Sequence, residues 1–442
     1  MFGAIKNALV TQKPIARIED PEKADKLYRQ MRIRMMYSMI VGYASFYLVR
    51  KNFSMAMPSF LNELGYTRTD LGIVLSAFSI IYGVGKFLNG MLADRANPRY
   101  FMAIGLFGAA VMNLFFGFSS SLLFFGIFWL GNAWFQAMGW PPCARMLSHW
   151  YSPREAGTMW GIWNSSHQIG GALIFVLSGF LIQYWGWRAA FFVPACMASV
   201  GALFLLHRLR DTPVSLGLPP IEEYRNDGKV EEEPEGKAPF WPLFREHILG
   251  NRLIWILCIG NFFVYIVRIG VMDWAPTFLV EAKGSSLGKA GFQVAAFEIA
   301  GIFGALGAGM LSDKVFGGRR GPVSVLFMAV LVLFLFYFWW VPPGHPFLDA
   351  MALVAVGFLV YGPQMLVGVS AADFASKKAV AAATGLTGTF GYMGSAVCGV
   401  GVGFIVDNWG WDGGFMFFIA SAIIGMFCFM LTWNAKAKVL ED

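Results

Sequence analysis

Charged residues are scarce in this sequence of 442 residues, of which 14% are Asp, Glu, Lys or Arg and 57% are hydrophobic. A soluble chain of this length cannot bury so much apolar surface, so the composition excludes a soluble globular protein. Apolar runs of about twenty residues predict a polytopic helical membrane protein. The net charge of +7 does not indicate a nucleic-acid partner, because the Lys and Arg residues fall in short loops between these runs.

Cysteine is also sparse, and all five cysteines lie inside apolar segments: Cys143, Cys196, Cys258, Cys398 and Cys428. The sequence has no CxxC pair and no Cys/His cluster with metal-ligand spacing, so we expect no disulfide, no metal site and no cofactor. It also lacks a nucleophile elbow and paired catalytic acids, which argues against an enzyme. The basic N-terminal segment lacks the apolar core and cleavage site of a signal peptide, which predicts that it is retained.

The apolar runs predict twelve membrane spans, six in each half of the chain. Their ranges are 35–60, 70–92, 100–119, 121–145, 157–183, 188–208, 253–280, 291–311, 321–341, 348–371, 382–406 and 412–434. Pro, Gly and charged residues at 209–250 predict a linker between the halves. We therefore expect an all-α membrane protein with two pseudo-symmetric six-helix bundles, residues 35–208 and 251–435, and terminal segments 1–34 and 436–442.

Positive charge alternates between the predicted loops, which predicts the orientation in the membrane. The more basic loops, besides the linker, carry Arg95, Arg99, Arg154, Lys314, Arg319, Arg320, Lys377 and Lys378. The positive-inside rule places these loops, the linker and both termini in the cytoplasm. We expect a multi-pass protein of a bacterial-type plasma (inner) membrane that functions as a monomer.

The two halves of the sequence repeat each other. GMLADR at 90–95 recurs as GMLSDK at 309–314, and GFLIQYWGWRAAFF at 179–192 recurs as GFIVDNWGWDGGFM at 403–416. Pro142 matches Pro363, and QIGGA at 168–172 matches YMGSA at 392–396. Four matches in order at nearly constant offset predict two parallel bundles related by an axis along the membrane normal.

Arg50 and Lys51 stand in the middle of the first predicted span, where a charged side chain costs roughly 2.5–3.5 kcal/mol. Such a residue persists when it faces a cavity, a partner or a ligand. Arg268 is the repeat mate of Arg50, because the two lie 45 and 44 residues before Asp313 and Asp94. Substrate sites of two-bundle transporters lie near the membrane midplane, so the two arginines are candidate ligands. For Lys51, snorkelling or a structural ion pair is the stronger interpretation.

The charge balance of the predicted membrane interior implies a missing anion. Its acids are Asp273, Glu298 and, near one end, Asp373, whereas its cations are Arg50, Lys51, Lys86, Arg268 and, when protonated, His167. Even if both central acids are ionised and paired, cations remain. Since the guanidinium fork matches oxyanions, a phosphate-bearing substrate is the economical counter-ion.

Further polar residues in the spans have two interpretations each. Lys86, four residues after Tyr82 on one helical face, either touches the anion or snorkels to the cytoplasmic end. His167 is either an interhelical donor or a proton-bearing phosphate ligand.

Three other tyrosines precede the arginines by three or seven residues and share their helical faces: Tyr43, Tyr47 and Tyr265. Core packing is the default for each, and a polar rim around a small hydroxylated ligand is the alternative. The repeated cytoplasmic motifs carry Asp94, Arg95, Asp313 and Lys314, which we interpret as conformational gate contacts rather than substrate ligands.

The whole chain resembles the organophosphate:inorganic phosphate antiporters of the major facilitator superfamily. The resemblance rests on GYASFYLVRKNFSMAMP, GMLADRANPR, MGWPPCARM, IWNSSHQIGGA, FVYIVRIGVMDWAPTFL, GMLSDKVFGGRRG, YGPQMLVG and NWGWDGGF. It implies that Arg50 and Arg268 hold the phosphate, and that Lys86, His167, Tyr43, Tyr47, Tyr82 and Tyr265 surround the substrate. It also implies that Lys51, Asp273 and Glu298 form ion pairs linking the halves.

This resemblance predicts a secondary transporter that exchanges a small phosphate monoester for inorganic phosphate. GWPPC, LRDTPVSLGLPPIEEYRND and DWAPTFL favour glycerol 3-phosphate. Thr384 and Thr387 stand where a hexose-phosphate transporter of the family has an Asp and Lys pair, which argues against hexose phosphates without excluding them. A sugar-phosphate-sensing receptor of the same family is a further alternative.

Overall fold

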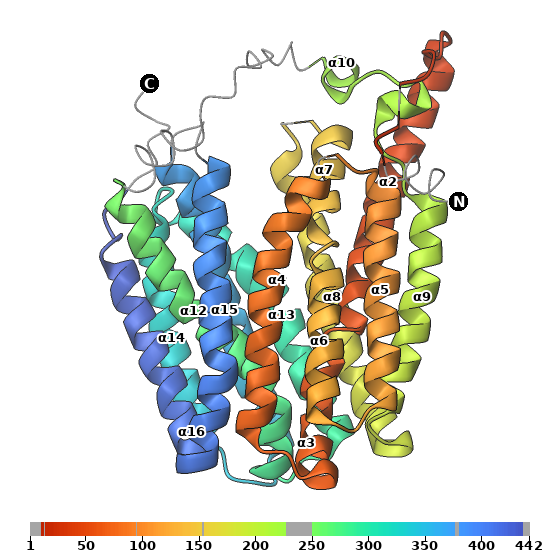
Figure 1. Cartoon of the computed structure of the whole chain (residues 1–442). Helices are drawn as coiled ribbons and strands as arrows, with labels where there is room; N and C mark the ends of the chain where they lie inside the picture. Colours follow the sequence, from red (N-terminus) through yellow and green to blue (C-terminus); the bar gives the residue numbers. More distant parts are fainter. Residues whose placement is uncertain are drawn as a thin grey trace. The chain divides into compact units, whose positions relative to one another are not determined.

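The computed structural model describes residues 10–12, 14–93, 95–152, 154–226, 250–375 and 380–435. Regular structure in these residues is helical, apart from one isolated β-bridge between Val10 and Ala96 (Figure 1). In chain order the helices are α2 (Pro21–Leu48), α3 (Asn52–Leu64), α4 (Arg68–Ala93), α5 (Pro98–Phe118), α6 (Leu122–Gln136), α7 (Trp140–Trp150), α8 (Ala156–Trp185), α9 (Ala189–Arg208), the 3-10 turn η1 (Pro213–Leu216), α10 (Ile221–Arg225), α12 (Arg252–Glu281), α13 (Leu287–Lys314), α14 (Arg320–Trp340), α15 (Pro346–Phe374) and α16 (Val380–Met430).

These helices agree with the twelve predicted spans. Ten helical segments in the described residues are long and apolar enough to cross a membrane. The last of them, in α16, covers the last two predicted spans. Gly410, whose φ is 67°, interrupts α16 and separates its two helical parts. The remaining predicted span, 35–60, corresponds to α2 and α3, which a break at residues 49–51 separates.

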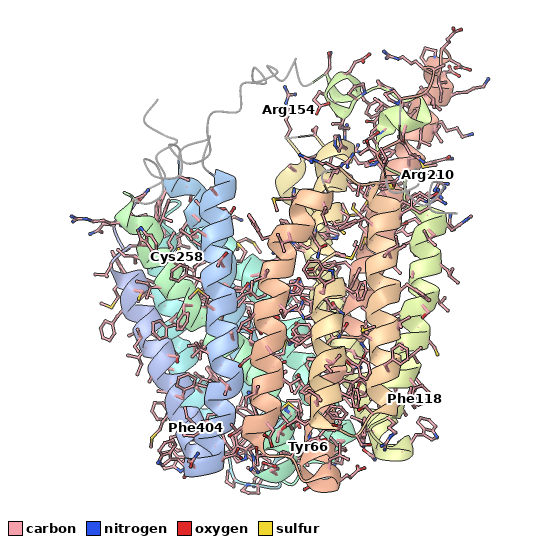
Figure 2. All side chains as sticks on the ribbon, viewed as in Figure 1. Tyr66, Phe118, Arg154, Arg210, Cys258 and Phe404 are labelled. Atoms are coloured by element: carbon pink, nitrogen blue, oxygen red, sulfur yellow. The ribbon has the colours of Figure 1, made fainter. Side chains whose placement is uncertain are left out.

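The helices present large apolar side chains on their outer faces. Phe118 and Phe404 point away from the helices (Figure 2) and are 75% and 50% exposed. Water would not tolerate so many exposed apolar groups, whereas lipid chains accept them. This surface is the one that a multi-pass membrane protein requires.

The helices pack into two compact units. Unit 1 consists of Met1–Lys51, Ile81–Ile174 and Arg188–Gly236. In it α5 packs against α6 and α9, and α2 packs against α9. Its core is built from buried apolar side chains of these helices, including Met39, Leu106 and Leu205.

Unit 2 consists of Asn52–Ile80, Phe175–Trp187 and Lys237–Asp442. Its closest helix pairs are α12 with α16 and α13 with α15. The second pair depends on glycine: a Cβ at Gly304 would collide with the Phe358 carbonyl oxygen, and one at Gly357 with that of Phe297. The predicted domain limits at residues 34, 208, 250 and 435 remain predictions, because packing in one conformation does not delimit sequence repeats.

Unit 2 therefore contains residues from both halves of the sequence. Arg68, at the start of α4, pairs with Glu281 at 2.9 Å and with Asp407 at 3.2 Å. Deeper in the unit, the Ser79 and Ser395 hydroxyls lie 2.9 Å apart. The beginning of α4 is thus joined to α12 and α16 by both ion pairs and a buried polar contact.

The N-terminal segment and the first part of the predicted linker pack together in unit 1. The Tyr28 and Tyr224 rings stack with centroids 3.9 Å apart. The amide of Ile18 donates to the Gly217 carbonyl at 2.9 Å. Residues 209–226 are thereby fastened to the first half of the chain, whereas residues 227–249 lie outside the described residues.

Candidate functional site

The break in the first span contains Arg50 and Lys51. Helix α2 ends at Leu48, and the amides of Arg50 and Lys51 both point to the Tyr47 carbonyl at 3.2 Å. This tight turn ends the regular helical pattern, so nearby carbonyl oxygens need other donors. Such discontinuous spans are common at transporter binding sites.

Three amide side chains from neighbouring helices supply those donors. Asn113 of α5 and Asn132 of α6 donate to the Val49 carbonyl at 3.0 and 2.8 Å. Gln136, also of α6, donates to the Phe46 carbonyl at 2.8 Å. All three amides are almost fully buried. They therefore hold the backbone immediately before Arg50 in its broken conformation.

The Arg50 side chain lies against two tyrosine rings of unit 1. Its guanidinium carbon is 4.3 Å from the ring centre of Tyr82 and 5.4 Å from that of Tyr47. A guanidinium that rests its face on aromatic rings gains a cation–π interaction and still has N–H groups at its edge to donate.

Other predicted site residues of unit 1 adjoin this pair. The Tyr47 ring lies 5.8 Å from the His167 ring and 5.9 Å from the Tyr43 ring. His167 also hydrogen-bonds through Nδ1 to the Asn164 carbonyl within its own helix. The structure thus brings Tyr43, Tyr47, Tyr82 and His167 together around Arg50.

Lys86 belongs to the same cluster. Its Nζ lies 4.3 Å from the ring centre of Trp140, the first residue of α7. The positive charges of Lys86 and Arg50 repel each other, and Tyr82 interacts with both. Two cations that repel each other and each pack on an aromatic ring form a site that an anion would stabilise.

Arg268, the repeat mate of Arg50, has a closely similar environment in unit 2. Its guanidinium carbon is 4.5 Å from the ring centre of Tyr361 and 5.6 Å from that of Tyr265. Its Nη2 donates to the Tyr361 hydroxyl at 3.1 Å, and this hydroxyl donates to Glu298 at 2.7 Å. The Tyr265 ring in turn packs edge-on against Tyr392, with centroids 5.8 Å apart.

The remaining predicted residues lie as follows. Asp273 accepts a hydrogen bond from the Ser54 hydroxyl at 2.8 Å. Lys51 is 5% exposed. The predicted ion-pair set of Lys51, Asp273 and Glu298 remains a prediction.

Of the predicted gate residues, Asp94 lies outside the described residues. Arg95 is exposed, and Lys314 lies in the last turn of α13. Asp313 pairs with Arg320, which also lies 3.3 Å from Asp373.

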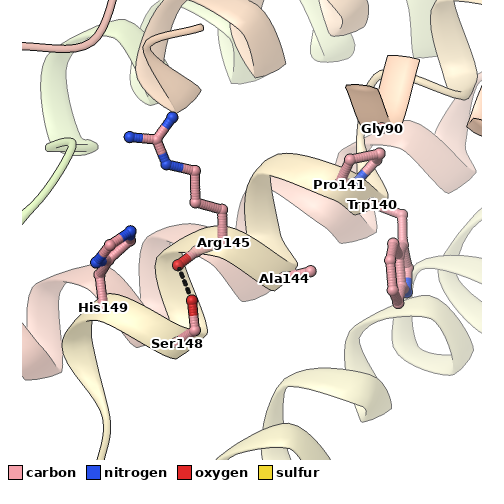
Figure 3. Close-up of a pocket in the computed structure, with 7 residues that line it drawn as sticks. All are labelled: Gly90, Trp140, Pro141, Ala144, Arg145, Ser148 and His149. Atoms are coloured by element: carbon pink, nitrogen blue, oxygen red, sulfur yellow. Dashed lines mark hydrogen bonds between the residues drawn. The ribbon is translucent and has the colours of Figure 1, made fainter. Parts of the chain in front are cut away.

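A pocket of about 520 Å³ opens beside α7 in unit 1 (Figure 3). It is lined by Gly90, Trp140, Pro141, Ala144, Arg145, Ser148 and His149. Arg145 does not present a free charge there, because it pairs with Asp211 at 3.1 Å and donates to the Ala96 carbonyl at 2.8 Å. Among the described lining residues, Trp140 is the one that also contacts a residue of the group around Arg50, namely Lys86. The residues around Arg50 are therefore the better candidate for the substrate site.

Five residues of these two clusters were not predicted from the sequence. Tyr361 and Trp140 are hard to recognise because aromatic residues in apolar spans are usually packing residues. The repeat could have indicated them, because they lie 221 residues apart, the same offset as Pro142 and Pro363.

The three amides that hold the break were also missed. Their signal was polar chemistry inside the apolar runs 100–119 and 121–145, where unpartnered amides are costly.

Comparison with known proteins supports a membrane transporter of the predicted superfamily. Residues 39–397 match the sequence profile of the Major Facilitator Superfamily. A probable hexose phosphate transport protein of Chlamydia pneumoniae is 46% identical, with 96% of each chain covered. The glycerol-3-phosphate transporter of Bacillus subtilis is 44% identical, over 96% of this chain and 98% of the relative. The membrane sensor protein UhpC of Escherichia coli is 39% identical, over 94% and 95%.

A solved structure has the same fold. It is a bacterial homolog of the human lysosomal transporter Spinster, inward-facing and unoccupied, and it matches with a TM-score of 0.75 over 91% of this chain and 97% of the other. At 16% identity this likeness concerns the fold alone.

The helices and these matches define a major facilitator, which confirms the expected fold class. Within that superfamily, the chain belongs to the organophosphate:inorganic phosphate antiporter family, as its motifs predicted. Proteins of this class are transporters rather than enzymes.

Proposed function

We propose that the protein is a secondary transporter that exchanges a small phosphate monoester for inorganic phosphate by alternating access. The observation that carries this proposal is the repeat-related pair of arginines. Arg50 lies at the break in the first predicted span, near the rings of Tyr47 and Tyr82, and Arg268 lies inside α12, near the rings of Tyr265 and Tyr361. Both guanidiniums pack near aromatic rings, and the guanidinium fork suits the oxygens of a phosphate.

In this mechanism Arg50 and Arg268 hold the phosphate group from the two sequence halves. Lys86 adds a third positive charge, and His167 binds the phosphate through a ring nitrogen that can carry a proton. Tyr43, Tyr47, Tyr82 and Tyr265 form the polar and aromatic rim for the organic moiety. Phosphate binding neutralises buried cations and so permits the conformational exchange, which yields antiport rather than leak.

Two further sets of residues have conformational roles in the proposal. Lys51, Asp273 and Glu298 form ion pairs between the halves that change as substrate binds. Asp94, Arg95, Asp313 and Lys314 act at the cytoplasmic gate, where the Asp313–Arg320 pair exemplifies a contact that can break and re-form. We also propose a bacterial inner membrane location, cytoplasmic termini and a functional monomer.

The organic moiety is proposed to be a three-carbon or a hexose phosphate. Glycerol 3-phosphate was favoured by sequence motifs, and one relative is named as its transporter. A similarly close relative is named as a probable hexose phosphate transport protein. Both substrates present the same phosphate dianion to the arginines, so the phosphate site supports either.

Proteoliposomes loaded with labelled phosphate test the proposal. External glycerol 3-phosphate, glucose 6-phosphate or 3-phosphoglycerate should release the label, and the compound that binds the site best should release it fastest. Arg50→Lys and Arg268→Lys should abolish exchange, because a point charge does not replace a bidentate fork. Near-normal exchange in either variant would disprove the phosphate-binding role.

A receptor that binds sugar phosphates with little flux is the second candidate, favoured by the similarity to a membrane sensor protein. Counterflow of labelled phosphate separates the two functions. A transporter accumulates label against an unlabelled internal pool, whereas a receptor binds glucose 6-phosphate without accumulating label.

A further inference from the structure

Four arginines from different parts of unit 1 converge at the C-terminal end of α9. They are Arg34 of α2, Arg99 of α5, Arg208 at the end of α9 and Arg210 just beyond it. Each is half-buried. Arg210 lies at the end of the unit where α2 and α9 meet (Figure 2).

Three of these side chains are fixed by the carbonyl groups that end α9. Arg34 donates to the carbonyls of Arg208 at 3.0 Å and His207 at 2.7 Å. Arg210 donates to the carbonyls of His207 at 3.0 Å and Leu209 at 2.7 Å. Arg99 donates to a carbonyl one turn earlier, that of Leu206. The guanidiniums are therefore held in place before any ligand arrives.

The cluster holds more positive charge than its surroundings balance. A helix C-terminus supplies only about half a negative charge. Arg34 is repelled by Arg208 and Arg99. Burial, and then repulsion by Arg34 and Arg99, lower the pKa of Arg210.

The acid nearest in sequence is Asp211, and it is already paired with Arg145. Within the described part of the chain, no ion pair involves any of the four arginines. A missing anion is therefore implied.

An exposed apolar strip of α9 leads to this cluster. Val193, Met197, Val200 and Leu203 recur at intervals of three or four residues and are 38%, 40%, 67% and 66% exposed. Helix α9 has 20 residues, which at 1.5 Å per residue is about the thickness of the bilayer hydrocarbon core. Its C-terminal arginines thus lie at the depth of the lipid headgroups.

We propose that the arginine cluster binds the phosphate of an anionic phospholipid, whose acyl chains lie along the exposed strip of α9. Guanidinium forks match phosphate oxygens, and basic pockets between helices on the cytoplasmic side bind anionic headgroups. The continuous apolar strip favours a lipid over free phosphate, because free phosphate has no apolar part that could pack against it. The site lies on the side that holds the N-terminus, predicted to be cytoplasmic.

Arg208 is the best residue to change. Its side chain makes no hydrogen bond within the described residues, so Arg208→Gln removes a charge without uncapping α9. Arg208→Lys keeps the charge and provides the rescue variant. The matched control is Arg188→Gln at the opposite end of α9, where the side chain donates to the Ser120 hydroxyl at 2.7 Å.

Native mass spectrometry of the full chain in detergent, mixed with phosphatidylglycerol and phosphatidylcholine of the same acyl chains, measures the preference. Wild type and Arg188→Gln should retain phosphatidylglycerol selectively. Arg208→Gln should lower that selectivity about fivefold, and Arg208→Lys should restore most of it. Equal retention of the two lipids by wild type, or unchanged selectivity in Arg208→Gln, would overturn the proposal. Displacement of the lipid by excess inorganic phosphate would also overturn it and assign the site to a soluble anion.

Discussion

The two arginine sites occupy repeat-related positions but are built differently. Arg50 follows a break between α2 and α3 that buried amides hold, whereas Arg268 lies inside the continuous helix α12. The positions that match Asn132 and Gln136 at the offset of 221 are Leu353 and Gly357, which offer no side-chain donor. An arginine can thus lie near a similar pair of tyrosine rings whether its own backbone is broken, as at Arg50, or helical, as at Arg268.

The difference extends to the hydroxyl groups. On the Arg268 side, Tyr361 both contacts the arginine by its face and links it to Glu298 through its hydroxyl. On the Arg50 side, Trp140 stands at the position of Tyr361 and contacts Lys86 instead. The repeat therefore conserves an aromatic ring beside a cation while it changes which cation is held and whether a carboxylate is connected.

The largest effect is expected from removing the amides that hold the break. Asn132→Leu combined with Gln136→Leu removes the side-chain donor to the buried Phe46 carbonyl, at about 1–3 kcal/mol for an unsatisfied group, and leaves the Val49 carbonyl with Asn113 alone among its described side-chain donors. We expect a clear fall in the unfolding temperature and at least about a tenfold rise in the KM for phosphate, measured by thermal unfolding and by exchange in proteoliposomes. The control is Asn89→Leu, since the one hydrogen bond of Asn89 within the described residues is a long 3.4 Å bond to the Trp134 carbonyl. An unchanged KM in the double variant would show that the amides do not position Arg50.

The next largest effect concerns the hydroxyl of Tyr361. Tyr361→Phe keeps the ring but disconnects Arg268 from Glu298, and loss of one charge-assisted hydrogen bond of about 1.5 kcal/mol predicts roughly tenfold weaker phosphate binding. Tyr82→Phe keeps the ring contact with Arg50 and should weaken binding much less. Titration of purified protein with phosphate measures both. Equal losses in the two variants would contradict the difference between the sites.

A smaller effect is expected at Trp140. Trp140→Leu removes the ring that faces Lys86, a cation–π contact of about 0.5–2 kcal/mol. Exchange should fall severalfold, and Trp140→Phe should recover most of it because a ring face remains. If the Phe variant were as impaired as the Leu variant, the indole rather than the cation–π contact would be the cause.

The smallest effect concerns the helix ends, where the charges are arranged in opposite ways. In unit 1, Glu155 lies between two arginines, Arg32 and Arg225. In unit 2, Arg320 lies between two aspartates, Asp313 and Asp373.

Burial alone would raise the pKa of Glu155, but hydrogen bonds from Arg32, the Ser152 amide and Arg225 outweigh it and lower that pKa. The ionised form therefore stabilises the fold at neutral pH, and this contribution is lost as the pH falls below the usual glutamate range, near 4.3. Glu155→Gln should lower stability by about 0.2–1 kcal/mol at pH 7. Thermal unfolding should show the difference from wild type disappearing at acid pH. A difference that persists there would exclude the charge as its source.

The sequence predicted the helical architecture and the repeat, and it indicated both arginines as candidate ligands, because apolar length and motif offset are local properties. It did not predict the break at residues 49–51. Apolar runs average over a window and are insensitive to one turn of backbone, and the stabilising amides come from residues more than sixty positions away. Tyr361 was missed for a related reason: only its three-dimensional neighbours distinguish it from a packing aromatic.

The break in the first span determines where a substitution can alter the backbone next to Arg50. The two parts of this span belong to different units, since the first segment of unit 1 ends at Lys51 and the first segment of unit 2 begins at Asn52. The Phe46 and Val49 carbonyls at the break are bonded to side chains of α5 and α6, so residues of unit 1 stabilise it. A substitution in α5 or α6 can therefore change the backbone immediately before Arg50 without altering either α2 or α3.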